Sequence, residues 1–523
     1  PNLIEALADP QVGVRVAAVE ALGEIGAADE AAPALEKALG DKDHVVRVKA
    51  VEALERLGRA SPATTRALVE ALGDRRVSVR RGAARLLAAA GPDTAPAAGA
   101  LAAAVKDADD EVCLASIQAL ALSGATTPTA LKAMSQALAD RRKGVRLATV
   151  DVLRELGGTS PAASSTLLTA LRDPDVEVRL AAATALQAVV FDRDAVSTIA
   201  EAMGDKDARV RAEVVTLLGE FPENERAIGL IAEALGDREA AVRSRAVLAL
   251  GSIGPAARGV APALTGRLHD ADPGVRQAAA LALGSLRLES PSAIEALAAA
   301  LRDKEGPVRA AATAALAELG PAAARALQPL IHSLNDGDPS VRIGAAIALG
   351  QTGPEARQAV PTLIALLRSK EATLREAAAF ALGRLGGEAK AAVPVLASLL
   401  RDKDARTRQM AAFVLGQIGA HANEAIGALA TAVRDRDAKV REAAIYALGE
   451  VGDHGPAVLR ALAGALKDRE EENRRRALKA LASFGPAANS VLPELRAASL
   501  DRSGLVREAA LEAIRRIDGK PGP

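Results

Sequence analysis

The residues of this 523-residue chain that could do chemistry are five histidines, one cysteine and many closely spaced aspartates. The histidines are scattered, and none begins a His-Glu-x-x-His metal motif: His44, His269, His332, His421 and His454. Cys113 is the only thiol, so the chain can form no internal disulfide and no zinc site built on several thiolates. The nucleophile elbow, the P-loop and the dinucleotide-binding glycine pattern are all missing. We therefore expect no enzyme activity, no metal and no cofactor.

The aspartates recur as Asp-x-Asp pairs, for example Asp402 and Asp404, and such oxygen-rich pairs could bind calcium. Calcium needs more converging oxygens than one short loop offers, and the Gly and Glu spacing of an EF-hand is absent. We interpret the first Asp as structural. This Asp is expected to pair with loop amides and with the Arg six residues later, so that a ladder forms along the chain. The predicted ladder includes these residues: Asp9, Arg15, Asp41, Arg47, Asp402, Arg408, Asp435 and Arg441.

The pairs belong to an internal repeat that fills the whole chain. The segments 402-DKDARTRQMAAFVLGQIG and 435-DRDAKVREAAIYALGEVG align without gaps, and the Arg of this pattern recurs every 32 or 33 residues. Cys113 takes the place of this Arg in one repeat, and Ser369 takes the place of the Asp in another. We interpret both as substitutions that a redundant array tolerates.

Each repeat contains two segments with apolar residues at three- and four-residue spacing, which is typical of helices with one buried face. In 272-DPG and 338-DPS the Asp is expected to cap the second helix, with Pro at its first position. The Gly that usually follows the second helix is expected to form a left-handed C-terminal cap. Such a pair cannot bury its apolar face alone, so neighbouring repeats must stack.

The internal proline of 353-GPEARQAVPTLIALLRS, the Asp loop and the Val-Arg opening of the second helix resemble HEAT repeats. They are most similar to the short, alanine-rich bacterial type that also occurs in phycobilisome-lyase-like proteins. This resemblance implies an all-α, right-handed superhelical solenoid of about sixteen HEAT-like repeats of 32–33 residues. It would be one continuous domain over residues 1–523, with a truncated first repeat. The resemblance also implies that the second helices line the concave surface.

The net charge of the chain does not favour binding to nucleic acid or to an anionic membrane, because 66 basic residues balance 66 acidic ones. Local basic clusters such as 141-RRK alternate with acidic neighbours, so we expect no nucleic-acid partner. No uninterrupted apolar run is long enough to cross a bilayer, and we expect no membrane insertion. The sequence does not determine the cellular compartment, and the cytoplasm is the favoured expectation.

One helix position, five residues after the recurring Arg, changes character along the chain. It is polar or charged in the first seven repeats: Glu20, Glu52, Arg85, Gln118, Asp151, Thr184 and Thr216. It is then apolar in seven repeats before Lys479 and Glu512 follow: Leu248, Leu281, Ala314, Ile347, Phe380, Phe413 and Tyr446. Because unpaired charges are costly to bury, the charged members predict that this position is exposed.

We therefore predict a partner-binding stripe on the concave surface, formed by Leu248, Leu281, Ile347, Phe380, Phe413 and Tyr446. With helices about 8–10 Å apart, it would be on the order of 50–60 Å long. An extended peptide of about 16–18 residues would cover it, and a long amphipathic helix is the alternative ligand. The stripe could also pack on itself or against a second copy of the chain.

The predicted function is that of a non-enzymatic scaffold that binds a protein or peptide in its concave groove. The alternatives are a structural spacer, a self-assembling rod and a chromophore-lyase-like accessory protein. Neither end has an obvious polar capping repeat, which is compatible with end-to-end or homotypic association. Phe191 and Phe221 replace the usual Gly turn, and we interpret them as plugs of an irregular joint around residues 186–225.

Overall fold

The structure is a computed structural model that describes residues 2–26, 28–58, 61–123, 127–191 and 195–518. In these residues all regular elements are α-helices or 3-10 helices, so the prediction of an all-α chain is confirmed. Two compact units divide the chain, residues 1–249 (unit 1) and residues 250–523 (unit 2).

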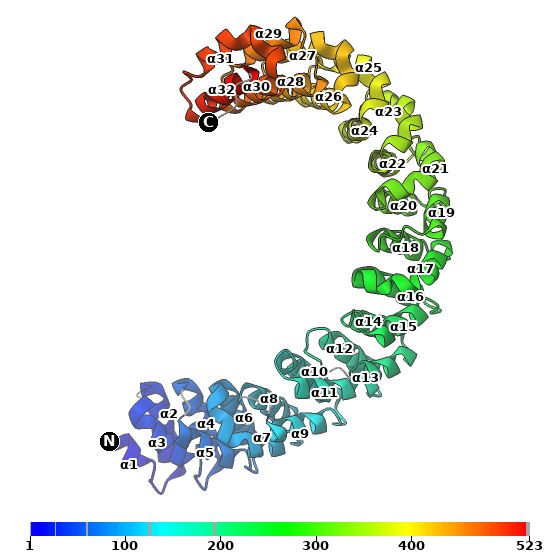
Figure 1. The fold of residues 1–523 in the computed structure, drawn as a ribbon. Coiled ribbons are helices and arrows are strands. Elements are labelled where there is room, and N and C mark those ends of the chain that lie inside the picture. Colours follow the sequence, from blue (N-terminus) through cyan, green and yellow to red (C-terminus); the bar gives the residue numbers. More distant parts are fainter. Residues whose placement is uncertain (1, 27, 59–60, 124–126, 192–194, 519–523) are drawn as a thin grey trace. The chain divides into compact units, whose positions relative to one another are not determined.

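Unit 1 is built from helix pairs in two layers, and each second helix packs against the second helix of the next repeat (Figure 1). The second helices are α2 (Val12–Ile25), α4 (His44–Leu57), α6 (Val77–Ala90), α8 (Asp110–Leu122), α10 (Lys143–Gly157), α12 (Val176–Leu186) and α14 (Ala208–Leu218). The first helices are α1 (Asn2–Ala6), α3 (Ala28–Ala38), α5 (Pro62–Ala71), α7 (Ala98–Ala104), α9 (Pro128–Ala137), α11 (Pro161–Leu168), α13 (Ala195–Glu201) and α15 (Glu225–Ala234). Three 3-10 helices join them: η1 (Gly91–Ala97), η2 (Thr169–Arg172) and η3 (Ala202–Gly204). Helix α16 (Ala240–Ile253) begins in unit 1 and ends in unit 2.

Unit 2 repeats the same two layers, and its second helices follow the inner side of the bend within this unit (Figure 1). They are α18 (Pro273–Ser285), α20 (Gly306–Glu318), α22 (Pro339–Thr352), α24 (Ala372–Leu385), α26 (Ala405–Ile418), α28 (Ala438–Val451), α30 (Glu471–Ser483) and α32 (Gly504–Ile517). The first helices are α17 (Ala261–Gly266), α19 (Pro291–Ala300), α21 (Leu327–Ser333), α23 (Val360–Leu366), α25 (Val393–Leu399), α27 (Ile426–Ala432), α29 (Pro456–Ala465) and α31 (Leu492–Ala498). The 3-10 helices are η4 (Gly254–Val260), η5 (Arg267–His269), η6 (Gly320–Ala326), η7 (Pro354–Ala359), η8 (Gly386–Ala392), η9 (Gly419–Ala425) and η10 (Gly485–Val491).

In most repeats of unit 2 the first segment is split into a 3-10 helix and a short α-helix with a proline in its first turn, although η9 and α27 are split without a proline and α3 continues through Pro33. Pro361 stands in the first turn of α23, directly after η7. Proline has no N–H group to donate and its ring clashes with the preceding turn, so it is tolerated at a helix start and not in a helix interior. The single first helix expected from the sequence is two elements in most repeats of unit 2.

The start of the second helix follows the sequence prediction. Asp338 caps α22 and accepts a hydrogen bond from the Ser340 amide at 2.8 Å, with Pro339 at the first helical position. Asp272 caps α18 in the same way through the Val275 amide at 3.1 Å. Each cap satisfies an amide that has no partner within the helix.

The C-terminal glycines follow the prediction only in part. Gly58 adopts the expected left-handed conformation, with φ 63° and ψ 17°. Gly353 has φ 84° and ψ −154°, which is a different region that is open almost only to glycine. The reason is the next element, because the chain must turn directly into η7 and leaves no room for a separate cap.

The core lies between the two layers, and the Val of the Val-Arg pair near the start of the second helix lies in it in most repeats. Val46, Val79 and Val275 are almost completely buried. Leucines of the first helices, such as Leu68 and Leu297, are buried against them. Small residues fill the contact between successive second helices: a Cβ atom on Gly284 would lie 2.7 Å from the Cα atom of Ala315. This close approach brings the second helices together on the inner side of unit 2.

Phe191 and Phe221 do meet, with ring centroids 5.3 Å apart. Both rings are half-buried, which fits their interpretation as plugs where the Gly turn is missing. Residues 192–194 of the expected joint lie outside the described residues.

One stretch, Ala240–His269, is apolar and long enough to cross a membrane by length and composition alone, which the sequence analysis did not expect. This stretch consists of four successive elements: α16, η4, α17 and η5. Gly254 breaks it with a φ of 72°, so it is not one straight helix.

Candidate functional site

The recurring arginine binds both its own loop and the following repeat. Nη1 of Arg15 donates to the carbonyl oxygens of Asp9 at 2.8 Å and Pro10 at 3.2 Å. Its Nε and Nη2 donate to the Asp41 carboxylate at 2.8 and 3.0 Å. The same two-bond pairing joins Arg47 to Asp74, Arg408 to Asp435 and Arg441 to Asp468. Paired bonds of this kind are directional as well as strong, so they fix the spacing of neighbouring repeats.

The expected contact between Asp9 and Arg15 is present, as is that between Asp402 and Arg408, but it is made by the backbone carbonyl of the Asp and not by its carboxylate. Side chains in the first turn of a helix point back toward its N-terminus. The guanidinium therefore reaches the carbonyl oxygens of its own loop: Arg408 Nη1 donates to the carbonyl of Asp402 at 2.8 Å. The loop carboxylate accepts an amide two residues later, as in the 2.8 Å bond from the Asp43 amide to Asp41, and faces the preceding repeat.

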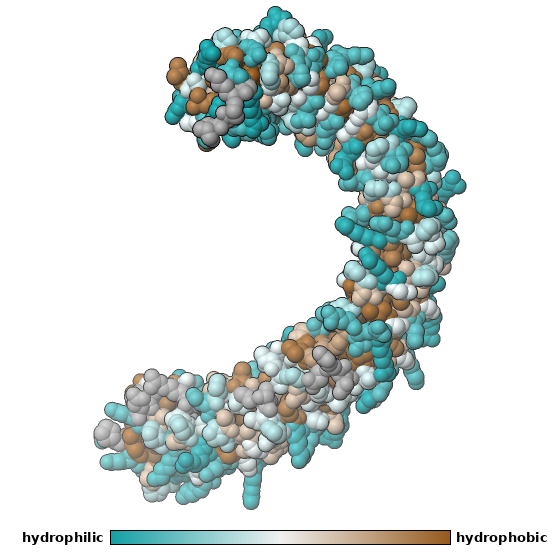
Figure 2. Space-filling view, in the orientation of Figure 1, coloured by the Kyte–Doolittle hydropathy of each residue, from teal (hydrophilic) through white to brown (hydrophobic). Residues whose placement is uncertain are grey.

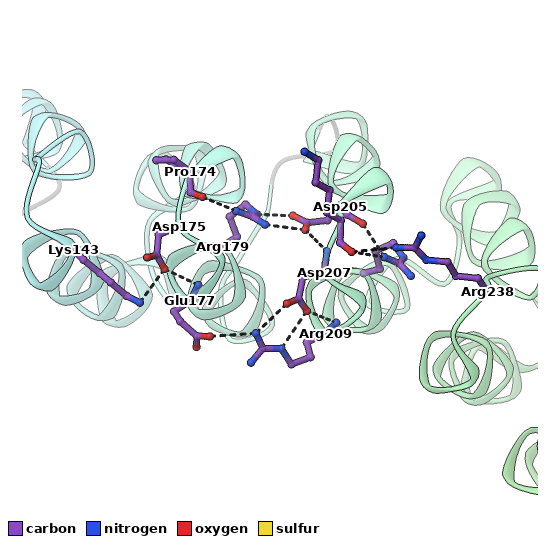
Figure 3. A network of polar contacts seen from close by, with 11 residues as sticks. Lys143, Pro174, Asp175, Glu177, Arg179, Asp205, Asp207, Arg209 and Arg238 are labelled. Carbon is purple, nitrogen blue, oxygen red and sulfur yellow. Dashed lines mark hydrogen bonds and ion pairs between the residues drawn. The ribbon is translucent and has the colours of Figure 1, made fainter.

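Figure 3 shows how further ion pairs reinforce the ladder in unit 1. Arg179 binds the Asp205 carboxylate through two bonds of 2.5 and 2.9 Å. Beside this rung, Arg209 joins Glu177 of the preceding repeat at 3.2 Å to Asp207 of its own loop at 3.0 Å. These acids and bases neutralise one another, so they bind the fold together and offer no free catalytic group.

The pKa values of the ladder aspartates reflect these bonds. The Arg276 guanidinium, together with a backbone amide, lowers the pKa of Asp303, although burial opposes the shift. For Asp41, burial raises the pKa, but the bonds from Arg15 and from the Asp43 amide outweigh this cost and lower it overall. Asp41 and Asp303 are therefore ionised at neutral pH.

Cys113 is buried, and its Sγ donates to the Val105 carbonyl at 2.9 Å. Burial above all raises the pKa of this thiol to about 11, while nearby carboxylates, which the sequence analysis took as the cause, contribute less. The thiolate that a nucleophile or metal ligand requires is thus disfavoured. Within the described residues no group of three or more His, Cys, Asp or Glu side chains could hold a metal ion.

The predicted stripe residues lie at the solvent-facing position of the second helices. In unit 2 we name this set the apolar row: Leu281, Ala314, Ile347, Phe380, Phe413 and Tyr446. Leu281 is 45% exposed, Phe380 39% and Phe413 47%, whereas the residues directly before and after each ring are buried. Leu248 is 49% exposed on α16 and belongs to unit 1.

Two of the rings contact each other. From the sequence, packing of the stripe on itself was only one of several possibilities. Phe413 and Tyr446 stack with ring centroids 5.6 Å apart and an angle of 26°. Tyr446 also covers Gly416, where a Cβ atom would lie 2.7 Å from the ring. Phe380 covers Gly350 in the same way, at 3.1 Å. The missing side chains of these glycines thus make room for rings that lie partly flat on the preceding helix and partly in water.

The apolar row is bordered by polar side chains that carry little net charge. On one side, Glu376 is paired with Arg406 at 3.0 Å, and Glu442 is paired with Lys439 at 2.8 Å. Three uncharged amides also border the row: Gln351, Gln409 and Gln417. On its visible face, Figure 2 shows apolar brown side chains interspersed with hydrophilic teal ones.

In the first three repeats of unit 1 the same helix position is occupied by ion pairs. Lys49 lies 3.0 Å from both Glu20 and Glu52. Arg85 binds Glu55 at 3.0 Å and Glu111 at 2.8 Å. These charged side chains have partners within unit 1, whereas Leu248 and the apolar row leave apolar side chains in contact with water.

Stacked two-helix repeats, joined by an Arg–Asp ladder, define the chain as an α-solenoid repeat protein. It belongs to the HEAT-repeat family, because the family described as HEAT repeats matches residues 1–89, 97–187, 164–241, 229–317, 327–406 and 393–472. The PBS lyase HEAT-like repeat matches residues 308–336.

Solved structures of karyopherins share the fold at low sequence identity. A structure of Kap95p, which concerns its binding to RanGDP, has a TM-score of 0.54 and 14% identity over 98% of this chain and 83% of Kap95p. A structure of Kap121p bound to RanGTP has a TM-score of 0.53 and 16% identity over 99% of this chain and 68% of Kap121p. No curated protein sequence matches the chain.

Proposed function

We propose that the protein is a non-enzymatic scaffold that binds a segment of a partner protein along the apolar row of unit 2. The observation that carries this proposal is the exposure of the row from Leu281 to Phe413, whose ring stacks on the half-buried Tyr446. Exposed apolar residues in a continuous series usually mark a binding site. Kap95p and Kap121p, which share the fold, bind the protein Ran, and this supports a protein ligand in general terms.

The ligand that fits best is an extended segment with apolar side chains and few charges. The amides of Gln351, Gln409 and Gln417 can both donate and accept hydrogen bonds. An extended backbone has unpaired N–H and C=O groups for them, whereas a helix has already paired its own. The row spans five steps of about 8–10 Å, so a segment of about 12–15 residues covers it.

The nearly neutral border of the row agrees with such a ligand. Because Glu376 and Glu442 are paired with basic neighbours, the border attracts neither a strongly acidic nor a strongly basic segment. A spacer would need no exposed rings, and a chromophore-lyase-like role would need a site that holds the chromophore. A second copy of the chain is the remaining competitor for the row.

The test is a selection of random 15-residue peptides on the purified full-length protein, followed by affinity measurements for the enriched peptide. The triple variant Phe380→Ser, Phe413→Ser and Tyr446→Ser should weaken binding by about 100-fold or more, because buried aromatic anchors dominate binding energy. The control, Val14→Ser, Val45→Ser and Val77→Ser, removes three exposed apolar residues from unit 1 and should keep the affinity.

Failure to enrich any peptide, or equal binding by the triple variant, would contradict the proposal. Sedimentation measurements complete the experiment. If the wild type is a dimer that the triple variant converts to a monomer, a second copy covers the row and the proposed function is wrong.

A further inference from the structure

A second surface of unit 2 lies on the loops that lead into the second helices. In three successive loops the ladder Asp has an exposed basic residue on each side. We name this set the basic edge: Arg401, Lys403, Arg434, Arg436, Lys467 and Arg469.

The carboxylates of these loops are already engaged. Asp435 is bound by Arg408 of the preceding repeat, and Asp468 is bound by Arg441. The cap carboxylate of Asp437 accepts the amides of Lys439 at 2.8 Å and Val440 at 3.2 Å. Within the part of the chain that the structure describes, no ion pair joins a basic-edge side chain to a carboxylate. The six side chains are exposed and none is paired with a carboxylate of the described residues, although Nη2 of Arg436 donates to the Lys403 carbonyl at 3.5 Å.

Two of these three loops carry an excess of positive charge. In residues 434–441, Arg434, Arg436, Lys439 and Arg441 stand against Asp435 and Asp437, which leaves two positive charges. Residues 401–408 have the same balance, whereas three consecutive glutamates leave residues 467–474 with one negative charge. The protein is neutral as a whole, so this edge is a local concentration of positive charge that attracts anions.

The basic edge is also hollowed between neighbouring loops. A hollow of about 460 Å³ is lined by Arg434, Arg436, Lys467 and Arg469, together with the ladder carboxylates Asp435 and Asp468. The adjoining hollow of about 660 Å³ is lined by Lys467, Arg469 and, from the following repeat, Arg502, and also by Asp468, Glu494 and Asp501. Volumes of about 300–1,000 Å³ are typical of binding pockets. An acidic side chain that enters such a hollow meets cations from two successive repeats.

We propose that the basic edge binds an acidic segment of a partner protein, whose separate carboxylates enter the hollows between the loops. Three residues of an extended peptide cover about 10 Å, which matches the repeat spacing of about 8–10 Å. Asp437 and Glu470 recur between the cations and repel a continuous polyphosphate chain, so a peptide is favoured over a nucleic acid. This surface lies on the loops, whereas the apolar row lies on the second helices, so the inference goes beyond the proposed function.

The test uses a fluorescent 12-residue peptide with Glu at every third position and Gly or Ser between, and an oligothymidylate of 12 nucleotides as a second probe. The variant Arg434→Gln, Arg436→Gln, Lys467→Gln and Arg469→Gln should lose peptide affinity by about tenfold or more at low salt. The matched control removes four exposed cations from the first-helix layer of unit 2: Arg325→Gln, Arg357→Gln, Lys390→Gln and Arg460→Gln. It changes the net charge by the same amount and should retain the affinity within about threefold.

Three results would overturn the proposal. Equal losses in the two variants would show attraction by overall charge and not by this edge. Tighter binding of the oligonucleotide than of the peptide would assign the edge to nucleic acid. No saturable peptide binding to the wild type would show that the edge has no acidic ligand.

Discussion

Arg142 holds the Asp140 carboxylate with bonds of 2.9 and 2.8 Å, next to the repeat in which Cys113 replaces the ladder arginine. Its third donor, Nη1, binds Asp110 of the preceding repeat at 2.9 Å. In the regular ladder, Asp140 would receive an arginine from the position of Cys113. Arg142 therefore supplies from the following repeat the connection that Cys113 cannot make.

Loss of this replacement should destabilise unit 1. Arg142→Gln leaves Asp140 and Asp110 without their charged partner, and we expect a loss of about 1–3 kcal/mol in unfolding free energy. Cys113→Arg alone should also destabilise, because two guanidinium groups would then compete for one carboxylate. The combination should recover stability relative to Arg142→Gln, since it restores a regular rung. Urea unfolding followed by circular dichroism measures the unfolding free energy of the two single variants and of the double variant. If the two single losses simply added in the double variant, the result would contradict this account.

Acid should remove the contribution of the same pair. The Arg142 hydrogen bond lowers the pKa of Asp140 from 3.8 to about 2. A carboxylate whose folded pKa lies below its unfolded value stabilises the fold fully above the unfolded value. This contribution is then lost as the pH falls toward the folded value. The difference in melting temperature between wild type and Arg142→Gln should stay constant from about pH 7 to pH 5 and shrink below about pH 4. A gap that narrows above pH 5 would be inconsistent with this account.

A missing rung in unit 2 can be restored. Ser369 stands where the other repeats carry Asp, and Arg342 binds the more exposed Glu371 at 2.8 Å instead. Ser369→Asp should offer Arg342 a paired acceptor and stabilise unit 2 by about 1 kcal/mol. Ser490→Asp adds the same charge at an exposed site and should change little. Thermal unfolding compares the stability of Ser369→Asp with that of Ser490→Asp. Equal effects would argue against an ion pair between Arg342 and the new aspartate.

The glycine beneath Tyr446 should not tolerate a side chain. A Cβ atom on Gly416 would lie 2.7 Å from the Tyr446 ring and 3.0 Å from the Cα atom of Ala447. Gly416→Ala should therefore cost about 1–3 kcal/mol through overpacking. Gly427, on α27, has no atom within 4 Å of such a Cβ, so Gly427→Ala should be neutral or stabilising. A neutral Gly416→Ala would show that the second helices are packed less closely than the structure indicates.

The repeat, the two helices and the Asp caps could be predicted because each is encoded locally. An Asp-Pro pair at residues 338 and 339 fixes a helix start through bonds within three residues. Which of two aspartates each ladder arginine binds through the carboxylate could not be predicted in the same way. Arg15 follows Asp9 by six residues and precedes Asp41 by 26, and a periodic sequence offers both partners at every step. Only the direction of the side chain in three dimensions decides between them.

The exposed position of Phe413 could be predicted because charged residues occupy it in other repeats. Its stacking on Tyr446 could not, since it depends on the distance between neighbouring helices and on Gly416 beneath the second ring. The compensation by Arg142 was missed for a related reason. Its signal, an extra arginine two residues after Asp140, looks in the sequence like one more member of a basic cluster.

The emission of Tyr446 gives the most direct measurement of the apolar row, because Tyr446 is the only tyrosine and the chain has no tryptophan. The enriched peptide, chosen without aromatic residues, is titrated into the full-length protein while acrylamide quenching of this emission is followed. We predict a saturable loss of quenching, with the same midpoint as peptide binding measured by anisotropy. Quenching that stays unchanged while the peptide is bound would contradict the central claim that the row is the binding site.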